Sequence, residues 1–425
     1  STAVGSFCDV PELSYDFQAP IREYGQISET AKELKLLSMF VHDYGETFCN
    51  MQPQFAGNDC ESTSVHTGDF QDAEDLSAFR MITRRIGDRG YLFVNNYQRG
   101  YEMAEHKDGM LRVQTADGEI SFPKQDIKNG AYFFYPFNFP LSDGVTLRWI
   151  NQTPLCNINQ KLWFFYGIDK MQYEADEKLS GQVLISMDRT WAKCAWRMKK
   201  YPNILFFSAL PILETENGIE VICRSDRAQK NCWIIMDATV EDAKTWIDNG
   251  WKKPDIIPDF LHVEGDASTI CVLSHELSAA DNQIVASFTH TDVNNCIILK
   301  EKTDFSMEEA CAIDDTGKDY REYVIRISYD KAYDAAKENI FLQIDFQADQ
   351  AELYLNGEKI ADQYYIGDVW EVSLKRFDFP TELILRLYPL EEDDKIYLET
   401  QPDYLNGRCC SLKDIRCVYE CKEKL

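Results

Sequence analysis

Short apolar runs separated by tight-turn signals dominate the chain from about residue 76 onward. The runs at 132–135, 162–165 and 204–207 are too short for helices and are rich in aromatic and aliphatic strand formers. Asn-Gly and Asp-Gly pairs suit the positive φ angles of tight hairpins. They occur at 108–109, 117–118, 129–130, 143–144, 217–218 and 356–357. The pattern predicts a mainly β protein built from antiparallel β-sandwich or jelly-roll domains.

One long amphipathic helix is predicted before the β-rich region. Leu34, Leu37, Val41 and Tyr44 recur at helical spacing, and Leu36 and Phe40 widen the apolar stripe. Residues 30–33, Thr-Ala-Lys-Glu, fit a capping box that would begin this helix. A helix this apolar needs a partner surface, and without one part of its stripe remains exposed. The only later helix that we predict with a definite position lies at 240–246.

The last predicted module begins near residue 318. Apolar and polar residues alternate in 340–346, which is the period of a half-buried strand. Residues 351–362 are typical of a hairpin that turns at Asn-Gly, and 370–374 and 383–387 follow as further strands. These elements predict a second antiparallel sandwich at the end of the chain.

The charge balance restricts the classes of partner. The chain has 425 residues and a net charge of −27, from 71 acidic and 44 basic side chains. Phosphate backbones and anionic lipid surfaces would be repelled, so we expect neither nucleic acid nor membrane as a partner. A neutral substrate such as a sugar suffers no such repulsion. Most of the acidity is typical of a solvated surface.

The cysteines give no sign of a metal site or a disulfide framework. Fourteen are present at irregular spacing, without C-x-x-C and without Cys/His pairs at zinc-ligand spacing. We therefore expect no metal or other cofactor, and mostly free thiols in a reducing cytoplasm. One cluster of cysteines could still contain a disulfide bond. It consists of Cys409, Cys410, Cys417 and Cys421. No signal peptide or membrane span is visible.

Residues 14–25 hold the first candidate site. Aromatic, carboxylate and amide groups crowd a short stretch that proline and glycine break just before the predicted helix. The pattern predicts the end of a buried strand running into a loop, as barrel enzymes place at the rim of their sites. Tyr15, Asp16 and Phe17 are the side chains that we expect to meet a substrate. Alternatively, Asp16 bonds backbone amides of the loop and Tyr15 packs between strand and helix.

Four stretches resemble glycoside hydrolase family 35, the β-galactosidases. Residues 14–25, with S-Y-D-F-Q-A-P and a following R-E-Y-G, are similar to the end of that family's last barrel strand. Residues 88–99 (D-R-G-Y-L-F-V-N-N-Y-Q-R) and 132–141, which include P-F-N, resemble strands that follow the barrel. Residues 351–372 resemble the galactose-binding-like jelly roll that closes these enzymes.

The resemblance implies a domain plan and a fold class. Residues 1–48 would be the end of the catalytic barrel (last strand, loop and helix), 49–175 a β-rich domain, 176–317 a second β-rich region and 318–425 a galactose-binding-like jelly roll. The implied fold is mainly β, with antiparallel β-sandwich or jelly-roll domains preceded by the last strand and helix of a (β/α)8 barrel.

The resemblance also implies a function. The parent enzyme would remove terminal β-galactose with retention, using two glutamates that this chain does not contain, so we expect no catalytic residue here. Its partners would be a β-galactoside or other neutral carbohydrate and the upstream catalytic barrel, in the same or a separate polypeptide. Phe17 stands where the family usually has a tyrosine that contributes to the galactose pocket. It keeps the apolar ring and loses the hydroxyl.

Other interpretations remain open. Tyr364, Tyr365 and Trp370 could form an aromatic platform for a sugar, although aromatic residues in a sandwich are more often core. The chain could also be a non-catalytic carbohydrate-binding or assembly protein, or one half of a split glycosidase.

Overall fold

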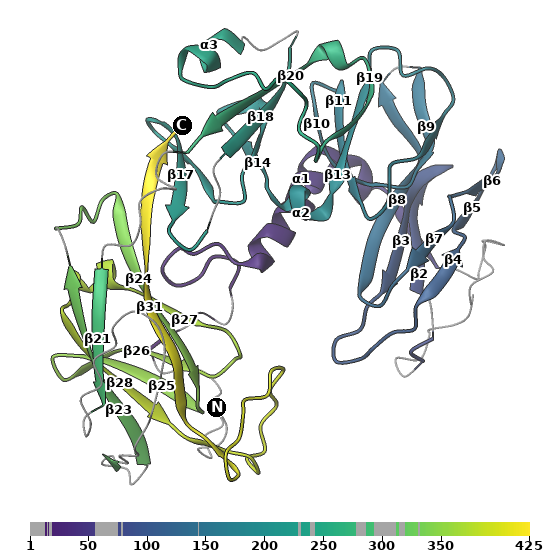
Figure 1. The fold of residues 1–425 in the computed structure, drawn as a ribbon. Coiled ribbons are helices and arrows are strands. Elements are labelled where there is room, and N and C mark those ends of the chain that lie inside the picture. Colours follow the sequence, from purple (N-terminus) through teal and green to yellow (C-terminus); the bar gives the residue numbers. More distant parts are fainter. Residues whose placement is uncertain are drawn as a thin grey trace. The chain divides into compact units, whose positions relative to one another are not determined.

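The computed structural model describes residues 13–14, 16, 19–55, 75–77, 80–142, 144–227, 231–238, 243–277, 286–292, 312–313, 319–329 and 332–425. Strands dominate these residues (Figure 1), so the predicted mainly β fold is confirmed. Their contacts define two compact units. Unit 1 comprises 1–31, 210–230 and 277–425, and unit 2 comprises 32–209 and 231–276. The sequence-predicted division at residues 48, 175 and 317 stays a prediction.

Helix α1 (Glu29–Cys49) confirms the predicted N-terminal helix, but its cap differs from the expected one. The Ser28 hydroxyl accepts a hydrogen bond from the Ala31 backbone N–H at 3.3 Å, so the capping residue lies two positions before the predicted Thr30. The predicted capping box at residues 30–33 is therefore wrong. Glu33 instead pairs with Arg189, because a tertiary ion pair competes successfully with a local cap.

Three sheets and two short ribbons make up the described strands of unit 2. The first sheet has the order β1 (Gln52–Phe55), β2 (Arg80–Ile86), β3 (Arg89–Asn96), β8 (Ala131–Ser142), β9 (Val145–Ile150) and β12 (Tyr173–Ala175). The second is β10 (Thr153–Ile158), β11 (Leu162–Gly167), β13 (Val183–Asp188) and β19 (His262–Gly265). The third is β14 (Ala195–Met198), β15 (Tyr201–Phe207), β18 (Asn231–Asp237) and β20 (Ile270–Glu276). The ribbons pair β4 (His106–Gly109) with β7 (Gln125–Ile127) and β5 (Arg112–Thr115) with β6 (Gly118–Ser121).

Helix α1 joins two core clusters of unit 2. Leu36 and Met39 pack with residues from the second and third sheets. Phe40 and Tyr44, one turn further on, pack with residues from the first and second sheets. The helix is thus fixed along one side by the burial of these four side chains.

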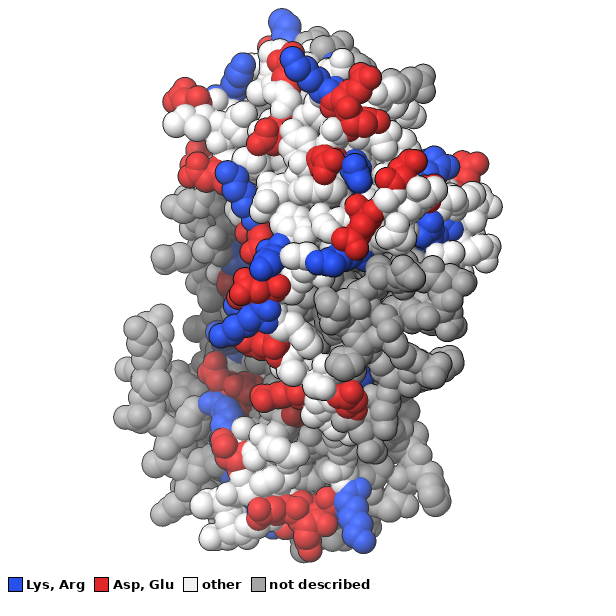
Figure 2. Space-filling view, turned by 90° about the vertical axis from the view of Figure 1, so that its right-hand side faces the viewer, with Lys and Arg blue, Asp and Glu red and all other residues white. Residues whose placement is uncertain are grey.

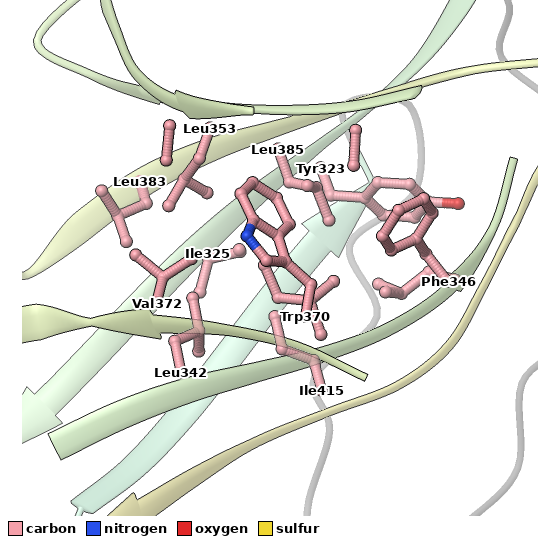
Figure 3. Close-up of a cluster of buried hydrophobic side chains, with 14 of the residues drawn as sticks. Tyr323, Ile325, Leu342, Phe346, Leu353, Trp370, Val372, Leu383, Leu385 and Ile415 are labelled. Carbon is pink, nitrogen blue, oxygen red and sulfur yellow. The ribbon is translucent and has the colours of Figure 1, made fainter. Parts of the chain in front are cut away.

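Unit 1 is an antiparallel sandwich. One sheet has the order β16 (Ile212–Thr215), β17 (Gly218–Arg224), β31 (Ser411–Lys424), β24 (Glu338–Gln347) and β27 (Trp370–Ser373). The other has the order β21 (Ala286–Asp292), β23 (Asp319–Tyr329), β28 (Glu382–Tyr388), β25 (Gln350–Leu355) and β26 (Glu358–Tyr364), with β22 (Ala312–Ile313) beside β23. A short ribbon pairs β29 (Leu390–Glu391) with β30 (Arg408–Cys409). Side chains from both sheets share one core (Figure 3).

The predicted elements of the last module are confirmed. The strands expected at 340–346, 370–374 and 383–387 correspond to β24, β27 and β28. The hairpin turn between β25 and β26 has Asn356 at φ 53° and Gly357 at φ 85°, as a turn that requires two positive φ angles demands.

Four short helical segments complete the described elements, one of them a 3-10 turn at Leu374–Phe377. Helix α2 (Arg189–Lys193) is capped by Asp188, whose carboxylate accepts a hydrogen bond from the Trp191 N–H at 2.8 Å. Helix α3 (Ala243–Asp248) overlaps the helix predicted at 240–246, of which residues 240–242 lie outside the described residues. A further turn of 3-10 helix covers Ala267–Thr269.

The barrel part of the predicted fold is not seen. The residues that the structure describes form no (β/α)8 barrel. The expected last barrel strand lies largely outside the described residues and stays a prediction. The described part of 14–28 shows a turn closed by an isolated bridge between Ile21 and Ile27. The helix and the antiparallel sheets are the parts of the fold prediction that the structure shows.

Acidic and basic side chains are interspersed with uncharged surface on the face shown in Figure 2. Within the described ranges, no helix is long and apolar enough to cross a membrane. The cluster in which a disulfide was considered contains only free thiols in the structure. These are Cys409, Cys410, Cys417 and Cys421.

Candidate functional site

The loop before α1 is bound to the edge of the unit 1 sandwich. The backbone N–H groups of Leu13 and Ser14 donate to the carboxylate of Asp362 on β26, at 3.0 and 2.8 Å. Further on, the Arg22 guanidinium lies 3.4 Å from the Asp368 carboxylate. The predicted candidate loop is therefore anchored by partners almost 350 residues away in the sequence.

Asp16 organises this loop. One carboxylate oxygen accepts a hydrogen bond from the Ala19 N–H at 3.1 Å, and the other accepts from the Glu23 N–H at 3.4 Å. This arrangement matches the alternative in which Asp16 bonds backbone amides of its own loop. Tyr15 and Phe17 lie outside the described residues. Contact of all three side chains with a substrate stays a prediction.

A very small cavity lies beside Asp16. Its walls include Asp16, Glu23, Gln363 and Trp370, so the structure brings residues of the N-terminal loop and of the C-terminal module together. The volume is about 10 Å³. That space is about what one water molecule needs and is far too small for a sugar ring. Burial raises the pKa of Glu23, and the hydrogen bond with Ser14 opposes this shift.

The three aromatic candidates of the last module lie mostly inside the sandwich. Trp370 and Tyr365 are only 5% and 7% exposed, and both rings pack on Phe346 with centroid distances of 6.3 and 6.2 Å. Figure 3 shows Trp370 between side chains of the two sheets. Tyr364 is half-buried at the end of β26. In this structure the rings of Tyr365 and Trp370 serve the core, and sugar binding by the three residues stays a prediction.

Helix α1 carries an apolar stripe that the sheets leave uncovered. Leu34, Leu37 and Val41 are 46%, 53% and 45% exposed, although they share one side of the helix. The other three residues of the predicted stripe, Leu36, Phe40 and Tyr44, are buried. The helix therefore has two apolar sides, one packed in unit 2 and one turned to solvent.

Polar side chains of α1 fix which side is packed. Glu33 accepts hydrogen bonds from Arg189 and Lys193 of α2, with closest N···O distances of 2.5 and 2.7 Å. Burial pushes the pKa of Glu33 upward, but these hydrogen bonds outweigh burial and the pKa lies below its usual value. Asp43, further along α1, accepts the Asn157 N–H at 2.7 Å and also pairs with Arg197.

Lys35 is the most perturbed cation of the helix. Its ammonium donates to the Lys193 carbonyl at 2.8 Å and lies 3.3 Å from the centroid of the Trp196 ring. Burial lowers the pKa of Lys35 to about 7. The sequence interpretation missed Lys35 and assigned Glu33 to a cap. Lys35 stands four residues before the apolar Met39 and so lies on the same side of the helix, which was the signal that could have identified it, since a charged residue on a packed side must find a partner.

Two buried carboxylates, Asp237 and Glu352, are engaged in structural pairs. Asp237 lies 3.4 Å from the Lys161 ammonium. Glu352 accepts hydrogen bonds from the hydroxyls of Tyr354 and Tyr388 and pairs with Lys359 at 3.1 Å. In the described part of the chain, no cluster of His, Cys, Asp and Glu side chains has the geometry of a metal site.

Comparisons with known proteins give little guidance. No family model matches the chain, and no curated protein matches it. Among solved structures, an α-xylosidase of glycoside hydrolase family 31 from Xanthomonas citri is similar over 87% of this chain, with 9% sequence identity and a TM-score of 0.15. The match spans 38% of the length of that structure. This resemblance to a glycoside hydrolase is weak and assigns the chain to no family.

Proposed function

We propose that the chain is the C-terminal β-domain portion of a glycoside hydrolase similar to the family 35 β-galactosidases, and that α1 docks on the catalytic barrel. The observation that carries the proposal is the exposed stripe of Leu34, Leu37 and Val41. The motif resemblance in 14–25 supports the choice of a barrel as the occupant, because that stretch leads directly into the helix. The barrel would supply the two catalytic glutamates.

The stripe is large enough to contribute to such an interface. Each of the three side chains is still about half exposed. Burying the remaining half of a Leu or Val contributes about 1 kcal/mol, so the three together contribute about 3 kcal/mol. That free energy corresponds to about a 100-fold gain in affinity. The rest of the affinity would come from other contacts with the barrel.

The test compares the purified chain alone with the chain mixed with the polypeptide encoded upstream of it. A chromogenic β-galactoside reports hydrolysis. We expect no turnover by the chain alone and activity on mixing. Leu37→Glu should weaken the association at least about 10-fold, because a charge would be buried at the interface. Ile247→Glu is the matched control, since Ile247 is 48% exposed on a different helix.

Two results would count against the proposal. Turnover by the chain alone would show that it contains its own catalytic pair. Equal association by wild type and Leu37→Glu would show that the stripe is not the docking surface. If the chain instead binds a sugar without supporting hydrolysis in any mixture, the non-catalytic carbohydrate-binding alternative is favoured.

A further inference from the structure

Unit 2 contains a second cavity that the proposed function does not use. Its volume is about 280 Å³, close to the lower end of the range of about 300–1,000 Å³ for small-molecule sites. Phe133 and Tyr166 form apolar walls, Tyr132 lies at the rim, and Glu33 and Arg189 line it with charged groups. All of these residues belong to unit 2.

The charged groups are already held in place. The Arg189 guanidinium pairs with the Glu33 carboxylate at 2.5 Å and donates to the Tyr132 carbonyl at 3.3 Å. It also lies 4.1 Å from the centroid of the Tyr132 ring. The Arg189 and Glu33 side chains remain 31% and 28% exposed, and the Glu33 carboxylate already accepts hydrogen bonds from Arg189, Lys193 and the Tyr132 hydroxyl. A bound hydroxyl would therefore compete with the Tyr132 hydroxyl for this carboxylate. A ligand would meet a donor and an acceptor side by side.

The aromatic groups remain neutral at ordinary pH. Burial raises the pKa of Tyr166 to about 12, so its hydroxyl is protonated. Burial also raises the pKa of Tyr132, and the nearby Arg189 opposes that shift. The cavity therefore offers flat apolar surface, one ionised carboxylate compensated by neighbouring cations, and neutral hydroxyls.

These features select a class of ligand. A strongly charged ligand would compete with the internal ion pair of Glu33 and Arg189. A ligand with one flat apolar face and adjacent hydroxyls can pack on the Tyr132 ring and, at the same time, form hydrogen bonds with the Glu33–Arg189 pair. We infer that this cavity binds one pyranose ring of a neutral carbohydrate. Tyr132 packs on the C–H face of the ring, while Glu33 accepts from one hydroxyl and Arg189 donates to its neighbour.

The inference goes beyond the proposed function, because the exposed stripe of α1 needs no ligand in this cavity. Experiments can refute the docking of α1 and the binding of a sugar in the cavity independently of each other. Loss of barrel docking in Leu37→Glu leaves the cavity intact, and loss of sugar binding in a cavity variant leaves the stripe intact.

The experiment measures binding to the whole chain by ligand-observed NMR and calorimetry. The probes are methyl β-galactoside and methyl β-glucoside, with galacturonate as an anionic probe and 4-nitrophenol as an aromatic probe without a sugar. A single ring makes few contacts, so we expect a dissociation constant of about 1 mM for a neutral glycoside. Galacturonate should bind more weakly than methyl β-galactoside.

Variants locate the site. Tyr132→Ala should weaken glycoside binding at least 10-fold, whereas Tyr132→Phe, which keeps the ring, should retain most of it. Tyr101→Ala is the matched control, because Tyr101 is also an exposed tyrosine of unit 2 and does not line the cavity. Circular dichroism and the thermal midpoint check that each variant is folded.

Three outcomes would overturn the inference. The first is no binding of either neutral glycoside at tens of millimolar. The second is unchanged glycoside affinity in Tyr132→Ala, which would place any sugar elsewhere on the chain. The third is binding of 4-nitrophenol alone, which would make the cavity a site for an aromatic ligand. Retained binding in Tyr132→Phe together with loss in Tyr132→Ala supports it.

Discussion

Arg224 offers the sharpest test of how the sandwich of unit 1 is held together. Its side chain is 5% exposed on β17 and pairs with Glu371 at 2.5 Å and with Asp226 at 3.1 Å. Gln343 lies opposite Glu371 in the β24–β27 ladder and donates to it at 2.6 Å. Arg224→Met keeps much of the apolar stem and removes the charge. The variant leaves the mostly buried Glu371 carboxylate, and the more exposed Asp226 carboxylate, without their cation.

The expected cost is large. Removing one partner of a buried ion pair destabilises a protein by about 3–5 kcal/mol, because the remaining charge stays buried without compensation. Replacing both partners, as in Arg224→Met with Glu371→Leu, should recover much of that loss. Urea unfolding monitored by tryptophan fluorescence gives the free energy of unfolding. Arg326→Met is the control, since the pair of Arg326 with Glu382 is more than half exposed and contributes about 1 kcal/mol or less.

The pH dependence adds an independent check. Burial pushes the pKa values of Glu371 and Asp226 upward, but Arg224 outweighs burial and both lie below their usual values. A carboxyl with a lowered pKa in the folded state contributes stability above its unfolded pKa of about 4 and loses it as the pH falls through the folded value. In Arg224→Met nothing from Arg224 opposes burial, so the pKa of Glu371 rises above its unfolded value in the variant. The difference in the free energy of unfolding between wild type and Arg224→Met should therefore be largest near pH 7 and shrink steadily as the pH falls, first as the carboxyl of the variant protonates and then, below about pH 4, as the paired carboxylates of the wild type protonate.

The reasoning would be refuted by a cost for Arg224→Met no larger than that for Arg326→Met. A double variant that is no more stable than Arg224→Met would also contradict it, because the loss would then come from packing and not from the unpaired carboxylate.

Two further predictions concern unit 2. Burial lowers the pKa of Lys35 to about 7, so above that pH the unfolded chain binds more protons than the folded chain. The free energy of unfolding of the wild type, measured relative to that of Lys35→Met, should therefore rise by up to about 1.4 kcal/mol per pH unit between pH 7 and 10. The prediction would be contradicted if the free energies of unfolding of the two proteins, measured by urea unfolding, changed equally with pH. Gly90→Ala should destabilise the chain by about 1–3 kcal/mol, because the new Cβ would lie 2.2 Å from the Arg84 carbonyl oxygen. Gly109→Ala, whose Cβ would meet its nearest atoms at 3.3 Å, should cost less in the same measurement.

Local patterns explain why much of the fold was predictable. The alternation in 340–346 and the Asn-Gly turn at 356–357 depend only on neighbours in sequence, and both appear as expected in β24 and the β25–β26 hairpin. The cap of α1 was misplaced because Ser28 and Thr30 are both acceptable caps, and only the distant Arg189 decides what Glu33 does.

The candidate sites were harder to predict, because they depend on long-range contacts. Nothing in the sequence near Leu13 indicates that its N–H will meet Asp362. The larger cavity likewise combines residues 33, 132, 166 and 189, which lie on four different elements. The aromatic residues at 365 and 370 were identifiable as strand residues, but the inward or outward direction of a side chain depends on register, which sequence alone leaves open.

The order of strands in unit 1 has a consequence for biosynthesis. Strand β31, at the very end of the chain, lies between β17 and β24 in the five-stranded sheet. Unit 2 is complete by residue 276, and a nascent chain can fold it while the ribosome is still translating the rest. The sheet of unit 1 cannot close until residues 411–424 have emerged, so β17 and β24 must wait with unpaired edges. A premature stop at or before codon 411, which removes β31, would therefore leave a folded unit 2 attached to an open, aggregation-prone sheet.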